Sequence, residues 1–249
     1  MWSFFVITLI QSSMKKFYKN HRFITNLIIV CMLASLFLCT LNVKQQYTFN
    51  YENNEVLYHG NTDTNKICFM INVYWGNEYI KPILDVFDEY NVKTTFFVGG
   101  SWVNKYPELL KEIYKRGHEI GNHGFFHKDQ DKLDYDGNYE EIDICHKIVK
   151  STIGIDMNLF APPSGAFNSS TIKACNFLGY KTIMWTLDTI DWRDKDSDLI
   201  FNRATQKAKG GDFILAHPTE KTLEALPKIL QFYSSNNLIA TTVTDTLSV

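Results

Sequence analysis

Two histidines four residues apart are the first candidates for chemistry in this sequence. His123 and His127 both lie in the segment 121–127, at the end of a short stretch that reads as a strand. Two imidazoles with this spacing on a tight turn can face one divalent metal ion. Histidine pairs also arise by chance, so two hydrogen-bonded surface histidines are an equally good interpretation of the pair taken alone.

Three later segments carry polar or aromatic residues directly after apolar runs. His217 ends one such run and precedes a proline, which suits a fixed general acid. The segment 185–194 places acids beside two indoles, a combination typical of a sugar-binding or catalytic loop. The segment 161–168 contains Pro162 and Pro163, which predict a rigid turn. Each feature alone has an ordinary structural explanation, so their significance depends on whether the fold brings them together.

Regular alternation of strand and helix patterns predicts how these residues are positioned. Apolar or β-branched runs predict seven strands, and stretches with helical spacing separate them. The predicted strands are 67–71, 94–98, 119–121, 158–160, 181–185, 213–216 and 238–243. This order implies βαβ units and a parallel sheet, either a closed or distorted barrel or a wide doubly wound sheet. Both bind ligands at the carboxyl ends of the strands, where the candidate residues lie.

Composition excludes two broad classes of protein. The chain has 249 residues, of which 45% are hydrophobic, enough for a large core and too many for a disordered chain. Its 25 Lys and Arg against 27 Asp and Glu give a net charge of -2, which argues against nucleic acid as a partner. Cys68, Cys145 and Cys175 fall at apolar-periodic positions, so we expect buried free thiols.

The N-terminal region has the pattern of a membrane anchor. Residues 23–41 carry no charge and would span about 28 Å as a helix, and the basic segment 1–22 precedes them. The positive-inside rule then places the C-terminal part outside the cell membrane. A polar linker, 42–64, leads into one domain, 65–249. The alternative is a cleaved signal peptide, which would make the protein secreted.

The exterior part, from about residue 66 to 243, resembles the polysaccharide deacetylases of carbohydrate esterase family 4, the NodB-homology domain. The runs 92–100 and 117–123 carry the resemblance, and 75–79 is similar to the sporulation-type branch. The resemblance implies a distorted (β/α)7 barrel. It also implies metal-dependent hydrolysis of the N-acetyl amide of amino sugars, in a cell-wall polymer such as peptidoglycan or another N-acetylglucosamine polymer.

The resemblance also assigns roles to individual residues. His123 and His127 match the metal ligands, with zinc as the first candidate, and His217 matches the general acid. Asp191 matches the residue that orients this acid. The expected substrate contacts are Trp75, Trp192, Leu215 and Pro163.

Three positions depart from the family pattern. Asn72, Val73 and Ala161 stand where the family has a catalytic Asp, a metal-binding Asp and an Arg that pairs with the catalytic Asp. An amide at position 72 orients a water but does not accept its proton, and losing a general base typically costs about 10²–10⁴ in rate. The metal site then lacks its carboxylate, unless the Asn72 oxygen, Asp129 or Asp131 completes it.

Three hypotheses follow from this mixed pattern. The first is a membrane-anchored N-deacetylase with an altered site, in which Asn72 occupies the catalytic position. The second is a catalytically impaired protein that binds glycan in the same groove, with Trp75, Trp185 and Trp192 as stacking surfaces. The third is an envelope protein whose barrel only supports partners.

Overall fold

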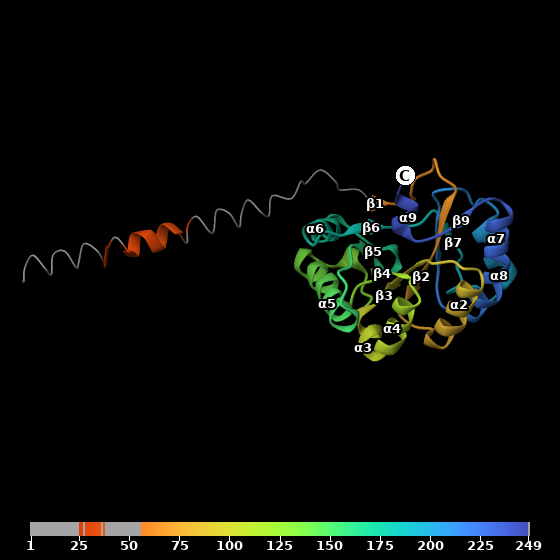
Figure 1. Ribbon diagram of the computed structural model, residues 1–249, viewed down its shortest axis with the longest axis horizontal. Coiled ribbons are helices and arrows are strands. Elements are labelled where there is room, and N and C mark those ends of the chain that lie inside the picture. Colours follow the sequence, from red (N-terminus) through yellow and green to blue (C-terminus); the bar gives the residue numbers. More distant parts are fainter. Residues whose placement is uncertain (1–24, 27, 36, 38–55, 249) are drawn as a thin grey trace, which may run out of the picture. The chain divides into compact units, whose positions relative to one another are not determined.

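The computed structural model describes residues 25–26, 28–35, 37 and 56–248 (Figure 1). The chain divides into two units, 1–51 and 52–249. Residues 25–26, 28–35 and 37 are helical, so the predicted anchor 23–41 lies partly outside the described residues. No helix within the described ranges is both long and apolar enough to cross a membrane.

A curled parallel sheet forms the centre of the second unit. In spatial order its strands are β1 (Val56–Leu57), β6 (Lys181–Ile183), β5 (Leu159–Phe160), β4 (Glu119–Asn122), β3 (Thr95–Val98), β2 (Lys66–Val73), β8 (Phe213–Ala216) and β7 (Leu187–Asp188). The strand β9 (Ile239–Ala240) pairs with the start of β2. The sheet ends at β1 on one side and β7 on the other, so the described strands form an open half-barrel rather than a closed one.

All seven predicted strands occur, and two short strands were not predicted. The strands β1 and β7 have two residues each, which is too short for a recognisable alternating pattern. The first of them lies in the stretch 42–64, which the sequence analysis interpreted as a linker. Its residues pair in register with β6. The linker region therefore contributes to the sheet from residue 56 onward.

Helices follow most strands and surround the sheet (Figure 1). They are α2 (Asn77–Glu89), α3 (Gly100–Lys105), α4 (Pro107–Lys115), α5 (Tyr135–Ile153), α6 (Ser169–Phe177), α7 (Ser197–Thr205), α8 (Glu220–Ser235) and α9 (Val243–Leu247). Two 3-10 turns, η1 (Gln130–Lys132) and η2 (Pro163–Gly165), lie in the connections. The side chain of Asn168 caps α6 in a capping box, which fixes where the loop after β5 ends.

The pleat of β2 separates two apolar clusters. Ile71 and Val73 belong to the larger cluster between sheet and helices. Cys68 and Met70 belong to a smaller cluster that includes Leu215. Successive side chains on a strand point to opposite faces. Asn72 therefore shares its face with the smaller cluster, and Val73 does not. The thiols of Cys68, Cys145 and Cys175 are buried and free, as predicted.

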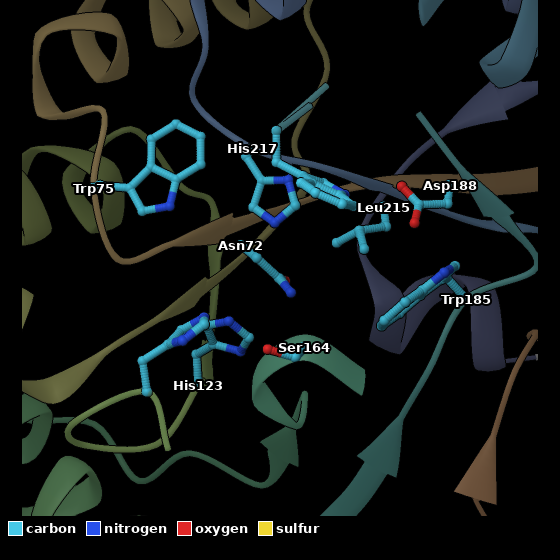
Figure 2. A pocket seen from close by; sticks show the side chains of 10 residues that line it. Asn72, Trp75, His123, Ser164, Trp185, Asp188, Leu215 and His217 are labelled. Carbon is cyan, nitrogen blue, oxygen red and sulfur yellow. The ribbon is translucent and has the colours of Figure 1, made fainter. Parts of the chain in front are cut away.

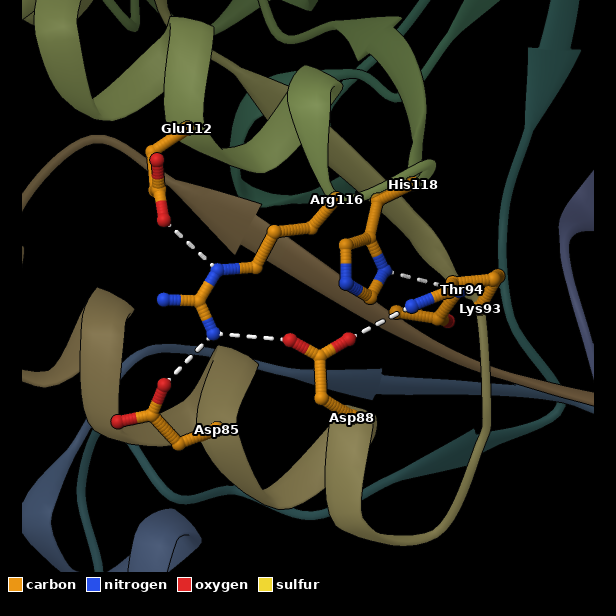
Figure 3. A network of polar contacts seen from close by, with 7 residues as sticks. All are labelled: Asp85, Asp88, Lys93, Thr94, Glu112, Arg116 and His118. Carbon is orange, nitrogen blue, oxygen red and sulfur yellow. Dashed lines mark hydrogen bonds and ion pairs between the residues drawn. The ribbon is translucent and has the colours of Figure 1, made fainter.

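A polar network ties α2 to the end of α4 (Figure 3). The Arg116 guanidinium donates to Asp85 at 2.6 Å, to Asp88 at 2.9 Å and to Glu112 at 2.8 Å. Beside this network, His118 is 2% exposed and packs against the rings of Phe87 and Phe96. Burial lowers the pKa of His118 to about 4. The folded protein therefore holds this imidazole in its neutral form.

We expect His118 to make stability depend on pH. Its pKa is lower in the folded chain than the unfolded value of 6.5, so its stabilising contribution is complete above pH 6.5 and falls as the pH drops toward 4. Between pH 6.5 and 5 this contribution falls by about 2 kcal/mol. The variant His118→Asn retains an acceptor for the Thr94 N–H and removes the titration. Urea unfolding at both pH values should show a smaller loss in the variant, and equal losses would contradict this account.

Candidate functional site

A pocket of about 450 Å³ opens at the carboxyl ends of the strands (Figure 2). Its size suits a small-molecule or sugar site. It is lined by Asn72, Trp75, His123, His127, Ser164, Trp185, Asp188, Trp192, Leu215 and His217. The fold thus brings together seven of the nine residues singled out from the sequence. Of the other two, Asp191 lies behind His217, and Pro163 is buried at the start of η2, next to the lining residue Ser164.

A buried carboxylate fixes His217. The Nδ1 of His217 donates to Asp191 Oδ1 at 2.8 Å, and the backbone N–H of His217 donates to Asp191 Oδ2 at 2.6 Å. The Thr222 hydroxyl also donates to Oδ2. The Trp75 indole stacks on the imidazole with ring centroids 5.7 Å apart and planes inclined by 9°. The imidazole is therefore held in one orientation, with Nε2 left to act as an acid or base.

The paired histidines from the sequence do meet in the pocket. The rings of His123 and His127 have centroids 4.9 Å apart. The Nδ1 of His123 lies 2.7 Å from the Ala161 carbonyl oxygen, so Nδ1 carries the proton and Nε2 is free to accept. Burial lowers the pKa of His123 to about 3, and burial also lowers the pKa of His127. Both rings are therefore neutral, the state in which imidazole binds a metal.

Among the described residues, no third His, Cys, Asp or Glu joins His123 and His127, so only the Asn72 amide oxygen in the same pocket is left for the third position that a catalytic zinc site requires. Val73 packs in the large apolar cluster and lies outside the pocket lining. Asp129, one sequence candidate for this role, forms an ion pair with Lys132 at 2.5 Å, and Asp131 is exposed. In the described part of the chain, no three His, Cys, Asp or Glu side chains are grouped to hold a metal. These residues do not fit the expected zinc site.

Asn72 provides a buried hydrogen-bond acceptor at the pocket. Its side chain is 3% exposed, and its Oδ1 atom has no hydrogen-bond partner among the described residues. In Figure 2 its amide lies between His123 and His217. A buried acceptor without a donor costs about 1–3 kcal/mol. A ligand N–H or hydroxyl group in the pocket would recover this energy.

Strained backbone surrounds the pocket. Three residues other than Gly and Asn have positive φ in the described chain: His127 at 56°, Ser164 at 56° and Ile190 at 54°. Two of them line the pocket, and Ile190 lies between Asp188 and Asp191 in the loop after β7. Positive φ is most unfavourable for a β-branched residue such as isoleucine. Strain of this kind concentrates at ligand sites, where the surrounding structure enforces it.

Sequence reasoning missed two pocket residues. Ser164 lies in the segment 161–168, where only Pro163 is an expected substrate contact, and Asp188 lies in the segment 185–194, where the expected roles fall on Asp191 and the indoles. Asp188 Oδ1 accepts the backbone N–H of Ile190 at 2.8 Å, and partial burial raises its pKa. The two-residue strand β7 ends at Asp188. A strand predicted at 187–188 would have placed the Asp188 carboxylate at a strand end, where ligands bind.

The side chain of Glu141 anchors the backbone of the loop 123–127. This carboxylate on α5 is 3% exposed. Its Oε2 accepts the backbone N–H groups of Phe125 at 3.0 Å and Phe126 at 2.8 Å. Its Oε1 lies 3.2 Å from the Lys128 ammonium. The loop between His123 and His127 is thus anchored by one side chain that contacts neither ring.

We expect Glu141→Ala to loosen this loop. Removing the acceptor leaves two N–H groups unpaired and should reduce the free energy of unfolding by about 1–3 kcal/mol. Hydrogen exchange at the amides of Phe125 and Phe126 should accelerate. The neighbouring exposed residue provides the control, Glu140→Ala, which should change neither quantity. Unchanged exchange in Glu141→Ala would refute the anchoring role.

Comparisons with known proteins agree on one family. The sequence profile named "Polysaccharide deacetylase" matches residues 59–183. Protein YlxY of Bacillus subtilis is 39% identical over 77% of this chain and 60% of its own length. The peptidoglycan-N-acetylmuramic acid deacetylase PdaA of the same species is 31% identical over 68% of this chain and 66% of its own length. The chain thus spans less than two thirds of either relative.

A solved structure of particular interest is a CE4 family pseudoenzyme from Bacillus anthracis. It is 31% identical to this chain, with a TM-score of 0.77 over 79% of this chain and 70% of its own. A variant of that pseudoenzyme is described as having restored enzymatic activity, and it matches with the same TM-score at 30% identity over 79% of this chain and 72% of its own.

Proposed function

This chain belongs to the polysaccharide deacetylase family, and we propose that it binds an amino-sugar polymer of the cell wall and is catalytically impaired. The named deacetylases among its relatives are hydrolases of carbon–nitrogen bonds that act on peptidoglycan. The pocket supports the binding part of the proposal, and the residues that replace the reactive carboxylates support the impairment.

One observation carries the proposal. Asn72 stands where the family resemblance implies a carboxylate that accepts a proton, and its amide lies between His217 and His123 in Figure 2. An amide has the shape of a carboxylate but does not titrate, so the pocket keeps its form and loses its base. The unpartnered Oδ1 atom is then an acceptor for a sugar hydroxyl or amide N–H.

Exposed indoles support glycan binding. Trp75 is 43% exposed and Trp192 is 56% exposed, although both side chains line the pocket. Trp185 forms a further wall. Large apolar side chains exposed at a pocket mark a binding site, and flat rings bury the faces of sugars efficiently.

A second candidate function is slow hydrolysis of the N-acetyl amide, the activity that the family resemblance implies. The specific observation in its favour is the intact pair of His217 and Asp191. This pair positions a proton donor for a leaving amine and stabilises the imidazolium. A divalent metal would supply a polarised water, but the described residues hold only two of its three expected ligands.

We also propose that residues 23–41 anchor the protein in the cell membrane, with the pocket on the outer side, or that this segment is a cleaved signal. The uncharged stretch after a basic segment supports this location. An outward-facing domain would meet peptidoglycan directly.

Binding is tested with the full chain. We expect it to bind N-acetylglucosamine oligomers and to sediment with peptidoglycan, and Trp192→Ala should weaken both by about tenfold or more. Tyr114→Ala removes an aromatic residue of similar exposure from α4 and should leave binding unchanged. Titration calorimetry measures the affinities. Absence of binding to every oligomer and to peptidoglycan would eliminate the proposal.

Catalytic impairment is tested by Asn72→Asp. We expect little acetate release from the wild-type chain and an increase in the variant of at least about tenfold, toward the 10²–10⁴ that a general base contributes. Assays with zinc, with cobalt and after chelation define the metal requirement. The control is Asn72→Ala, which provides no base. Wild-type release as fast as that of Asn72→Asp would mean that the natural protein is an unimpaired enzyme.

A further inference from the structure

This inference rests on the proposed function, binding of an amino-sugar polymer, and concerns which sugar units the pocket selects. We propose that the pocket prefers units with a free ammonium group over N-acetylated units, with Asp188 as the counter-ion. The ligand would then be a partly de-N-acetylated glycan.

Asp188 is the carboxylate that lines the pocket. Its side chain lies beside Leu215 and above Trp185 in Figure 2. The second acid of the loop, Asp191, is 4% exposed and accepts three hydrogen bonds from His217 and Thr222. A ligand entering the pocket therefore meets the charge of Asp188 directly, whereas Asp191 is already satisfied.

The charges of His217, Arg193 and Arg203 act on Asp188 at longer range, but none of these groups forms an ion pair with it. No lysine or arginine is among the described residues that line the pocket. The His217 ring is directed toward Asp191, at 2.8 Å. Among the described residues that line the pocket, Asp188 is the one carboxylate.

Nearby arginines are engaged elsewhere. Arg193 and Arg203 both pair with Asp194, at 2.8 Å and 2.6 Å. Arg203 also donates to the backbone oxygen of Thr189. Among the residues that the structure describes, no lysine or arginine lies within ion-pair distance of Asp188. Partial burial raises its pKa, so the carboxylate gains from a cation that enters with the ligand.

The aromatic walls suit a cation as well as a sugar face. Trp185 and Trp192 line the pocket with Asp188, and indole is the ring that attracts cations most strongly. A carboxylate next to indoles favours an ammonium group, because ion pairing and cation–π attraction act together. An acetamide is neutral and gains neither interaction.

The test compares tetramers of glucosamine and N-acetylglucosamine by titration calorimetry with the full chain. The titrations are run at about pH 5.5, below the pKa of the glucosamine amines, so that most of these amines carry a proton. We expect the glucosamine tetramer to bind about 10- to 100-fold more tightly, the effect of one charged hydrogen bond. Asp188→Asn keeps an acceptor for the Ile190 N–H and should abolish this preference. Asp198→Asn removes an equal charge from an exposed position on α7 and should retain it.

Each other outcome overturns the inference. Equal or tighter binding of the N-acetylated tetramer would refute it and leave the proposed function standing. A preference that survives in Asp188→Asn, or disappears in Asp198→Asn, would mean that general charge rather than Asp188 selects the ligand. Binding of neither tetramer, with no sedimentation on peptidoglycan, would remove the proposed function and this inference with it.

Discussion

The alternation of side chains along β2 is the constraint on which the site depends. It directs Asn72 into the pocket and Val73 into the apolar cluster between sheet and helices. The two positions are adjacent in sequence, yet they belong to different environments. The neutral, polar Asn72 leaves a hydrogen-bond acceptor without a partner at the pocket, whereas Val73 adds to the core. A neutral side chain at each of the two positions is therefore compatible with the half-barrel.

The three pocket histidines are held in place by buried groups that lie outside the pocket lining. Asp191, which also accepts a hydrogen bond from Thr222, fixes the orientation of His217. Glu141 fixes the loop that carries His123 and His127. These carboxylates are almost completely buried, and their donors lie at short distances. Buried carboxylates that position other residues in this way are typical of a pocket that binds a ligand. The strained residue Ile190, between two acids of the same loop, fits this view.

Much of this arrangement was predictable because its signals are local. Long apolar runs predicted the strands that matter, and the rule for strand ends predicted that His123, His217 and Trp192 would share one pocket. Asp188 was missed because β7 has only two residues, and a strand that short has no pattern. The role of Glu141 depends on contacts across the turn between β4 and α5, which no periodicity encodes. The strain at Ile190 likewise arises from tertiary packing rather than from residue type.

The open form of the barrel has a consequence for the solubility of the protein. A sheet that does not close exposes the hydrogen-bonding groups of its last strands, which can pair with another chain and start aggregation. Here those strands are β1 and β7, and each contributes only two residues. An edge this short offers too few groups in register for a second molecule to extend the sheet. The half-barrel thus leaves room for the pocket while limiting the template for fibrous assembly.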